Sequence, residues 1–519
     1  MATATGVLDP PAGPPARASA RVGVWLPPLL LVVVSVLARL PALVNARGVN
    51  SDAAVVGLQA MHILHGEWSW FLWGAGYQAS FDAALVAAAF AITGPSALTL
   101  MVVPLIGHLV LVGLAYDVLR RAVGRGGAAV ACLPLVFAPQ SINGVALYAP
   151  RQWAITATVL AVWLAARAGG PRAPLWLVSS GFVAGFAVYL DLFTLQMMPA
   201  VALYALWCAL AVPRRPRAVG ALLLGSAAGV AVIAWSRAQP VADAAKAGMT
   251  FDKIGANWTL MVDQCLPYLL GVEVFVQDPV TLGHPLRPMP WPVQVIQAAA
   301  ACVSVAAVCW AVVAVVRRIG PAPVRRLGAL GLVGSAAAIG GFLVSTMPAD
   351  LLSARYLAPI VWLAPFTLAP AAYALGVRWF AGLIAPFVVA VGLGGWYALA
   401  PYVVDGVPVR DPRGVAQDEN VLAGALRAEG VEYAAAQYWL AYRLTFLFDE
   451  DPVVVPLALA DDRYRPYRDG FDTAPVVAYV FHPSEPRATW QTTAGELDAQ
   501  GVAYRREEIA GFTVLIVRR

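Results

Sequence analysis

VWLPPLLLVVVSVLARLPALV, residues 24–44, is an apolar run long enough to cross the hydrocarbon core of a bilayer. VNSDAAVVGLQAMHILHG, residues 49–66, follows it and places a carboxylate, Asp52, where the chain leaves the membrane. The segment after Asp52 is more apolar than an ordinary loop. The role of this carboxylate decides whether the chain is a transporter, an enzyme or neither.

The composition is that of a membrane protein. Of 519 residues, 60% are hydrophobic and only 13% are charged. The net charge of +5 comes from arginines between apolar runs, so it reports topology and does not indicate nucleic-acid binding. The five cysteines are scattered and show no metal-ligand spacing. We expect no cofactor and no structural disulfide; a divalent metal stays an open alternative.

Eleven apolar runs predict transmembrane helices, so we predict an all-α polytopic membrane protein. They are residues 23–44, 97–119, 127–143, 152–167, 175–192, 194–212, 218–236, 292–316, 327–346, 356–375 and 379–400. Residues 1–22 are rich in Pro and Ala and predict a disordered tail.

The tail at 401–519 changes character. Helical patterns (NVLAGALRAEG, YWLAYRLTFLF) alternate there with short β-rich runs (DPVVVPLAL, APVVAYVF, FTVLIVRR). This alternation predicts a small soluble α/β domain after the membrane domain at 23–400.

Arginine clusters set the orientation, because basic residues favour the cytoplasmic side. The clusters that fall on the N-terminal side are Arg17 and Arg21; Arg120, Arg121 and Arg125; Arg167 and Arg172; Arg214, Arg215 and Arg217; Arg317, Arg318, Arg325 and Arg326; and Arg378. The N-terminus is therefore expected in the cytoplasm. Fewer basic residues, Arg39 among them, lie in or beside the other loops. Residues 45–96, 237–291 and 401–519 are expected outside.

One segment, SFDAALVAAAFAITG at 80–94, is ambiguous. As a span it would reverse every later loop, so we predict a helix on the outer membrane surface. Residues 53–66 predict another surface helix, whose polar Gln59, His62 and His65 would form a narrow wet face. The aromatic-rich EWSWFLWGAGYQ that follows, which includes Tyr77, is typical of headgroup depth.

Asp52 has two interpretations. Asn50, Ser51 or Asp52 could each cap the helix that follows. Alternatively, a carboxylate held beside the outer face of the bilayer could take a proton from a hydroxyl. Capping and catalysis do not exclude one another.

The first outer loop resembles that of membrane glycosyltransferases with the GT-C fold, including bacterial relatives of protein O-mannosyltransferases and of the lipid A aminoarabinose transferase. The resemblance is carried by SDAAVVGLQAMHILHGEWSWFLWGAGYQASFDAALVAAAFAITGPSALTL, by ARYLAPI at 354–360 and by YWLAYRLTF at 438–446. The order of these features and their sidedness match over the whole chain. Many relatives carry an Asp-Glu pair where this chain has Asp52 and Ala53, which argues against a metal at that point.

The resemblance implies transfer of a sugar from a polyprenyl-phosphate donor, with inversion, to a lipid, glycan or protein acceptor on the outer face. Asp52 would be the general base. The candidates for the donor phosphate are Arg355, Arg151, Arg237, Lys246 and Lys253, with Arg47 as a further cation. The candidates for substrate contacts are Asp82, Tyr77, His284 and Glu273. The expected location is a bacterial inner membrane.

Two other functions stay open from the sequence. A transporter or lipid-sugar flippase would need ionisable residues deep in its spans, whereas Asp117 and Asp191 lie near predicted span ends. A non-catalytic subunit that only binds a lipid-linked sugar would share most of the residues of an enzyme.

Overall fold

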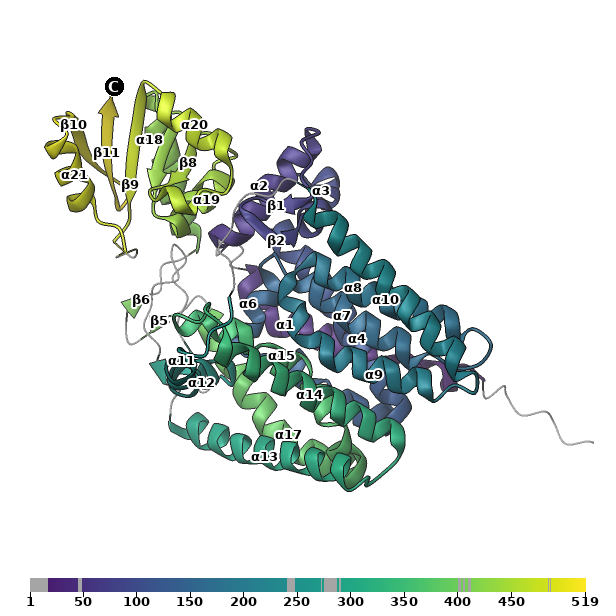
Figure 1. The fold of residues 1–519 in the computed structure, drawn as a ribbon. Helices are drawn as coiled ribbons and strands as arrows, with labels where there is room; N and C mark the ends of the chain where they lie inside the picture. The colour runs from purple at the N-terminus through teal and green to yellow at the C-terminus, as the bar shows by residue number, and fades with distance from the viewer. Residues whose placement is uncertain are drawn as a thin grey trace, which may run out of the picture.

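The structure is a computed structural model in which a long helical bundle carries a smaller α/β domain at one end (Figure 1). It describes residues 17–44, 49–239, 248–271, 273–274, 287–288, 291–399, 403–404, 407–408, 412–483, 485 and 487–519. The predicted fold class, a polytopic helical membrane protein with a C-terminal α/β domain, is confirmed.

Eight helical stretches in the described part of the chain are long and apolar enough to cross a membrane. The main bundle helices are α1 (Arg17–Val44), α4 (Ala97–Ala131), α7 (Gln152–Ala166), α8 (Ala173–Leu190), α9 (Met198–Leu210), α10 (Arg215–Arg237), α13 (Trp291–Val316), α14 (Ala322–Val344) and α17 (Ala369–Leu399). Short pieces between them are α5 (Leu133–Val136), α6 (Gln140–Leu147), η2 (Leu192–Met197), α11 (Ile254–Leu260), η3 (Met261–Cys265), α12 (Leu266–Leu269), β3 (Glu273–Val274), β4 (Arg287–Pro288), β5 (Val403–Val404) and β6 (Val407–Pro408).

The eleven predicted spans and these eight stretches differ for local reasons. Gly124 inside α4 and Gly376 inside α17 take φ angles of 76° and 68°, which glycine adopts readily, and each divides two predicted spans. The span predicted at 152–167 is the 15-residue α7, which is shorter than a typical span. The span predicted at 356–375 is broken into η4 (Leu351–Leu357), α15 (Pro359–Trp362), α16 (Ala364–Thr367) and the start of α17.

Arg39 corrects the sequence interpretation, which placed it in or beside an outer loop. Its side chain is fully buried inside α1. It donates to the carbonyl oxygens of Ser35, Leu135 and Val136 at 3.1 Å. The Nε2 of His108 lies 2.9 Å from its guanidinium. Backbone carbonyls therefore satisfy a cation that no acid pairs among the described residues.

Helices α8 and α10 approach each other through glycines. Cβ atoms added at Gly185 or Gly229 would fall 2.5 Å or 2.8 Å from the facing glycine's Cα atom. A Cβ atom at Gly225 would fall 2.0 Å from the carbonyl oxygen of Val178. Small residues permit such backbone contact between membrane helices, where van der Waals packing drives association.

The first outer loop folds as α2 (Ser51–Leu64), a hairpin of β1 (Phe71–Leu72) and β2 (Ala75–Ala79), and α3 (Phe81–Thr93). The wet face expected on α2 is wrong at Gln59, whereas His65 is exposed as predicted. Gln59 is fully buried and donates to the Phe71 carbonyl at 3.0 Å and to the Ser80 hydroxyl at 2.9 Å. The polar side chain of Gln59 thus forms hydrogen bonds inside the protein and does not face water.

The C-terminal domain is a five-stranded mixed sheet in the order β10-β11-β9-β7-β8, with helices packed on it. Its elements are α18 (Pro412–Ala428), β7 (Tyr433–Ala436), α19 (Tyr438–Leu447), β8 (Val453–Pro456), η5 (Leu459–Asp461), α20 (Arg465–Thr473), β9 (Val476–Phe481), α21 (Trp490–Ala499), β10 (Tyr504–Ile509) and β11 (Phe512–Arg518). β7 runs parallel to β8 and β9, whereas β11 pairs antiparallel with β9 and β10.

This domain docks on the first outer loop. His62 of α2 lies 2.8 Å from the carboxylate of Glu450 and 2.7 Å from that of Glu67. Burial lowers the pKa of His62, but the hydrogen bonds and charges of Glu450 and Glu67 outweigh it and leave the pKa raised. Trp73 of the hairpin stacks on Tyr464 with ring centroids 4.0 Å apart.

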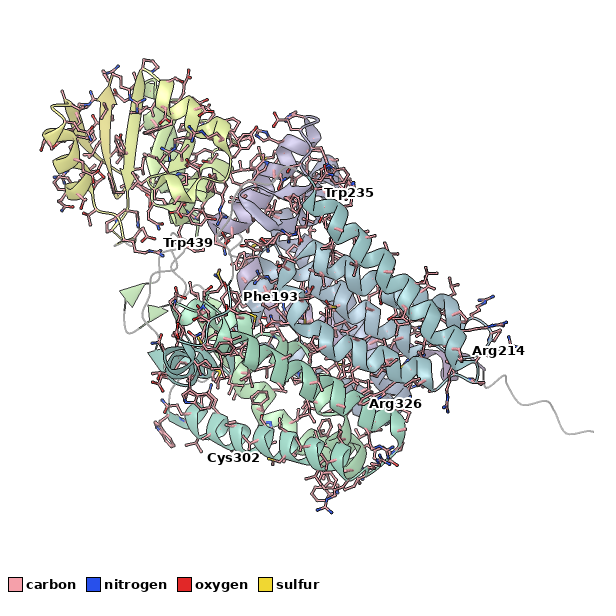
Figure 2. All side chains as sticks on the ribbon, in the orientation of Figure 1. Phe193, Arg214, Trp235, Cys302, Arg326 and Trp439 are labelled. Atoms are coloured by element: carbon pink, nitrogen blue, oxygen red, sulfur yellow. The ribbon has the colours of Figure 1, made fainter. Side chains whose placement is uncertain are left out.

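The two ends of the bundle differ in composition. Arg214 and Arg326, both predicted on the cytoplasmic side, lie at the end far from the C-terminal domain (Figure 2). Trp235 lies at the other end, near the domain, and Trp439 belongs to the domain itself. This arrangement agrees with the predicted outward-facing C-terminal domain.

A Gly225→Ala substitution tests the α8–α10 contact. The added methyl group must push α8 and α10 apart, so we expect unfolding to become easier by about 1–3 kcal/mol. Thermal unfolding in detergent measures the change. Gly220→Ala is the matched control on the same helix, because a Cβ atom there meets nothing within 4 Å. Equal melting temperatures for the two variants would contradict the packing described.

Candidate active site

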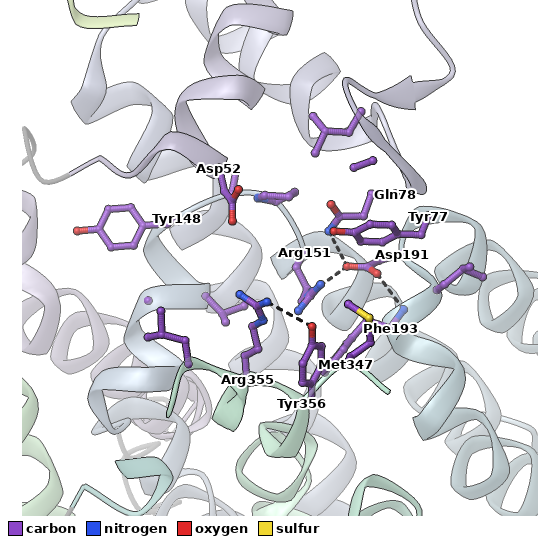
Figure 3. A pocket seen from close by; sticks show the side chains of 18 of the residues that line it. Asp52, Tyr77, Gln78, Tyr148, Arg151, Asp191, Phe193, Met347, Arg355 and Tyr356 are labelled. Carbon is purple, nitrogen blue, oxygen red and sulfur yellow. Dashed lines mark hydrogen bonds and ion pairs between the residues drawn. The ribbon is translucent and has the colours of Figure 1, made fainter. Parts of the chain in front are cut away.

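The end of the bundle beside the C-terminal domain holds a cavity of about 1320 Å³. Membrane helices, the first outer loop and the C-terminal domain all contribute walls. In Figure 3, Asp52 faces Arg355 and Arg151 across a common space. The residues singled out from the sequence that line it are Asp52, Tyr77, Arg151, Arg237 and Arg355.

Asp52 is free of a capping role. Asn50 is the N-cap of α2, and its side chain accepts a hydrogen bond of 2.9 Å from the backbone N–H of Ala53. Asp52 lies in the first turn, where the helix dipole favours a carboxylate. Its side chain is 38% exposed and lines the cavity. Asn50 therefore caps α2, which leaves Asp52 available for chemistry.

Two side chains of the C-terminal domain hold Asp52. The hydroxyl of Tyr438 donates to Asp52 Oδ1 at 2.5 Å, and the guanidinium of Arg463 lies 4.0 Å from the same oxygen. Burial, and then the charge of Asp52, raise the pKa of Tyr438 well above its ordinary value. The phenol therefore stays protonated, and its O–H group donates a hydrogen bond to the carboxylate.

A second acid, Asp191, is committed to structure. It is almost wholly buried, and it pairs with Arg151 Nε and accepts from the Gln78 amide, at 2.8 Å and 2.9 Å. It also caps η2 by accepting from the backbone N–H of Phe193 at 2.8 Å. Figure 3 shows these three contacts. Asp191 thus fixes Arg151 at the wall of the cavity.

The backbone of Arg151 is unusual. Its φ angle is 116°, a conformation that costs a non-glycine residue on the order of 1–3 kcal/mol. The ion pair with Asp191 and the ring of Phe193, 4.4 Å from the guanidinium, hold it there. Strain of this kind is common where a side chain must be aimed at a ligand.

Arg355 and Arg237 are the cavity arginines whose hydrogen-bond partners, among the described residues, are uncharged groups of the backbone or of a tyrosine. Arg355 is exposed and donates to the Tyr356 hydroxyl at 3.3 Å. Arg237, at the end of α10, donates to the Gly76 carbonyl at 3.2 Å. Neither forms an ion pair with an acid in the described part of the chain. Guanidinium groups in such positions can bind an anion from solution.

Asp82 lies behind this wall, not in the cavity. Its side chain is buried at the start of α3, and its Oδ1 has no hydrogen-bond partner in the described structure. Burial first, and then the charge of Asp191, raise its pKa to about 7. Tyr77 does line the cavity, and burial is the main cause of its raised pKa.

Lys253 and Glu273 are not among the residues that line the cavity. Lys253 is exposed and donates to the Thr346 carbonyl at 3.5 Å. Glu273 lies in β3. Lys246, His284 and Arg47 lie outside the described residues. Among the described residues, no three His, Cys, Asp or Glu side chains are grouped to hold a metal ion.

Among the polar residues of the cavity wall that sequence reasoning missed are Gln78, Tyr438, Asp461 and Arg463. Asp191 was noted only as an acid near a span end. YWLAYRLTF, which contains Tyr438, was recognised as a family-like segment without a role. No local pattern marks Arg463, because only the folded chain brings it beside Asp52.

Comparison with known proteins supports the fold. Residues 80–236 match the family model described as dolichyl-phosphate-mannose-protein mannosyltransferase. The apo crystal structure of ArnT from Cupriavidus metallidurans is similar with a TM-score of 0.50 at 12% identity, over 96% of this chain and 98% of that chain. A comparison of the sequence with curated proteins found no match.

Two further solved structures are similar at a lower level. ArnT from Cupriavidus metallidurans bound to undecaprenyl phosphate gives a TM-score of 0.46 at 14% identity, over 96% and 98% of the two chains. The Archaeoglobus fulgidus oligosaccharyltransferase in complex with Zn and sulfate gives 0.49 at 12% identity, over 94% and 72%. The family model and the apo ArnT structure confirm the resemblance noted from the sequence: the chain has the GT-C fold of membrane glycosyltransferases.

The pKa of Asp82 predicts a pH-dependent stability. Because its pKa is raised in the fold, the folded chain holds this proton more tightly than the unfolded chain. That stabilisation is complete below the ordinary pKa of an aspartate and is lost as the pH rises through about 7. Between about pH 5 and about pH 8, the melting temperature of the wild type should therefore fall relative to Asp82→Asn.

Thermal unfolding across this pH range checks the prediction. An exposed acid such as Asp498 provides the control, since Asp498→Asn should keep the pH dependence of the wild type. If Asp82→Asn and wild type change with pH in parallel, Asp82 does not titrate as described.

Proposed function

We propose that this protein transfers a sugar from a polyprenyl-phosphate donor to an acceptor hydroxyl at the outer face of the membrane, inverting the anomeric centre. The observation that carries the proposal is the cavity itself, where the carboxylate of Asp52 faces the guanidinium of Arg355. The family model matched by residues 80–236 describes transferases that use a dolichyl-phosphate-linked sugar, which has the same donor chemistry.

The reaction needs a base on one face of the anomeric carbon and cations beside the phosphate that leaves from the opposite face. The acceptor oxygen attacks the anomeric carbon and loses its proton to Asp52. The bond from that carbon to the phosphate oxygen breaks, and its electron pair stays on the phosphate. A positioned base contributes about 10²–10⁴-fold to such a step.

Fixed cations stabilise the charge that grows on the departing phosphate. Arg355 and Arg237 have no acidic partner in the described part of the chain, so they are suited to bind it. Arg151 is already paired with Asp191 and keeps a supporting role at the same wall. Of the described residues that line the cavity, four arginines stand against three aspartates, an excess of one positive charge.

An apolar wall is suited to the isoprenoid chain. The cavity is lined by apolar residues of η2, α9 and α14, among them Leu195, Pro199, Ala337, Phe342 and Val344. Leu195 is 57% exposed, so this wall includes apolar surface open to the surroundings. In a bilayer, lipid tails would cover such surface at no cost, which allows a prenyl chain to lie there.

The buried charge of the bundle argues against a transport path. Arg39 and His108 are fully buried, and Arg39 donates to the Nε2 of His108 and to backbone carbonyl oxygens. An ion or sugar path would need ionisable groups that face water inside the membrane. The acids near the span ends, Asp117 and Asp191, are likewise paired with arginines.

Turnover of radiolabelled polyprenyl-phosphate sugars by the purified protein in lipid tests the function. Wild type should release label from the lipid. Asp52→Asn should lower kcat by about 10²–10⁴-fold with donor binding retained, because only the base is lost. Arg355→Ala should lower kcat by about 10²–10³-fold, because charge develops on the phosphate in the transition state.

Two variants serve as controls. Asp461→Asn removes another carboxylate of the same cavity, so a larger loss there than in Asp52→Asn would assign the base to Asp461. Arg214→Ala removes an arginine at the far end of the bundle and should leave turnover unchanged. Donor binding without release in the wild type would favour a binding subunit, and movement of labelled lipid between leaflets would favour a flippase.

A further inference from the structure

Asp52 is connected to the C-terminal domain by two hydrogen bonds in series, from Arg463 to Tyr438 and from Tyr438 to Asp52. We propose that Tyr438 and Arg463 are positioning residues for the catalytic carboxylate, so that the C-terminal domain completes the active site. This inference rests on the proposed function, and it assigns that domain a part in the same reaction.

The direction of the two hydrogen bonds is fixed by chemistry. The Nε of Arg463 lies 3.2 Å from the Tyr438 hydroxyl, and a guanidinium can only donate. The hydroxyl oxygen must therefore accept from Arg463 and direct its own proton at Asp52 Oδ1. An acceptor alcohol would then meet Oδ2, which has no partner in the described structure. The carboxylate is held by one oxygen and reacts with the other.

Arg463 is itself held in a fixed orientation. Its Nη1 donates to the Gly74 carbonyl at 2.7 Å, and its backbone N–H donates to the Tyr442 hydroxyl at 2.6 Å. A Cβ atom at Gly74 would fall 2.5 Å from the Arg463 Cδ atom, so the hairpin can approach this closely only with glycine. The arginine thus bridges the first outer loop and the C-terminal domain.

Tyr438 is positioned by the start of α2. The hydroxyl of Ser51 donates to the Tyr438 carbonyl at 2.6 Å and accepts from the backbone N–H of Arg443 at 3.2 Å. The start of α2 is therefore hydrogen-bonded to the backbone of α19 directly beside Asp52. Because Tyr438 is buried, it has little freedom to leave the carboxylate.

The two walls of the cavity have different roles in this arrangement. Arg355, Arg237 and the apolar residues lie on the membrane helices and are suited to the donor. Gln437, Trp439 and Asp461 belong to the C-terminal domain and line the same cavity from the other part of the protein. The C-terminal domain then forms the acceptor side, with Tyr438 and Arg463 holding the base between the two substrates.

The test uses the full-length protein in lipid with the same donor panel. Tyr438→Phe and Arg463→Ala should each lower kcat by about 10- to 100-fold, the effect of losing a hydrogen bond to a charged group. Donor binding and the donor KM should change by less than about twofold, because other residues hold the donor. Arg463→Lys keeps the charge and should recover part of the lost kcat.

A double variant distinguishes a serial contact from two independent ones. Because Arg463 donates to Tyr438 and both lie beside the same oxygen of Asp52, the combined variant should be less impaired than the product of the two single losses. Arg465→Ala is the control, since Arg465 is exposed two residues away and pairs only with Asp469 among the described residues. It should keep the kcat and the melting temperature of the wild type.

The outcomes separate this inference from the proposed function. Turnover by the wild type with unchanged kcat in Tyr438→Phe and Arg463→Ala would contradict the inference and leave the function intact. A loss of donor binding equal to the loss of kcat, together with a lower melting temperature, would reduce both residues to structural ones and also contradict it. No release by the wild type from any donor would contradict the proposed function and this inference together.

Discussion

The first turn of α2 is the point on which the arrangement of the whole protein depends. Within this turn Ser51 bonds the backbone of α19, and Asp52 accepts from Tyr438. The first helix of the outer loop thereby fixes the C-terminal domain beside the end of the bundle. The same contact places the carboxylate of Asp52 at the cavity beneath that domain. The contacts that dock the C-terminal domain on the first outer loop therefore also form part of the candidate active site.

The electrostatics of the cavity follow from how each charge is satisfied. The carboxylate of Asp191 is bound by Arg151, Gln78 and the backbone at the start of η2. Asp52, in contrast, keeps one oxygen without a partner in the described structure. Arg355 bonds only a neutral tyrosine hydroxyl among the described residues. An acid with a free oxygen and a cation without an acid, facing one space, are what proton transfer and phosphate departure require.

The sequence predicted the parts of this site that depend on local pattern. The apolar run before Asp52 located the carboxylate at a membrane edge, and a short motif singled out Arg355. The partners of Asp52 could not be predicted from the sequence, because Arg463 carries no local signal and lies near Asp52 only through long-range packing. Gln59 was misread because polar spacing on a helix does not tell whether water or protein lies opposite. In the C-terminal domain β8, β9 and β11 matched apolar β-rich runs, whereas β10, YRREEI, is too polar to show one.

The central claim is that Asp52 and Arg355 act on opposite faces of the anomeric carbon of one bound sugar. A structure of the protein with a non-hydrolysable polyprenyl-phosphate sugar tests it most directly. The account predicts the phosphate within about 3 Å of the Arg355 guanidinium, with the prenyl chain along α9 and α14. It also predicts that the anomeric carbon presents its free face to Asp52, with room for one acceptor oxygen between them. A phosphate bound away from Arg355, or a sugar whose free face points away from Asp52, would contradict the account.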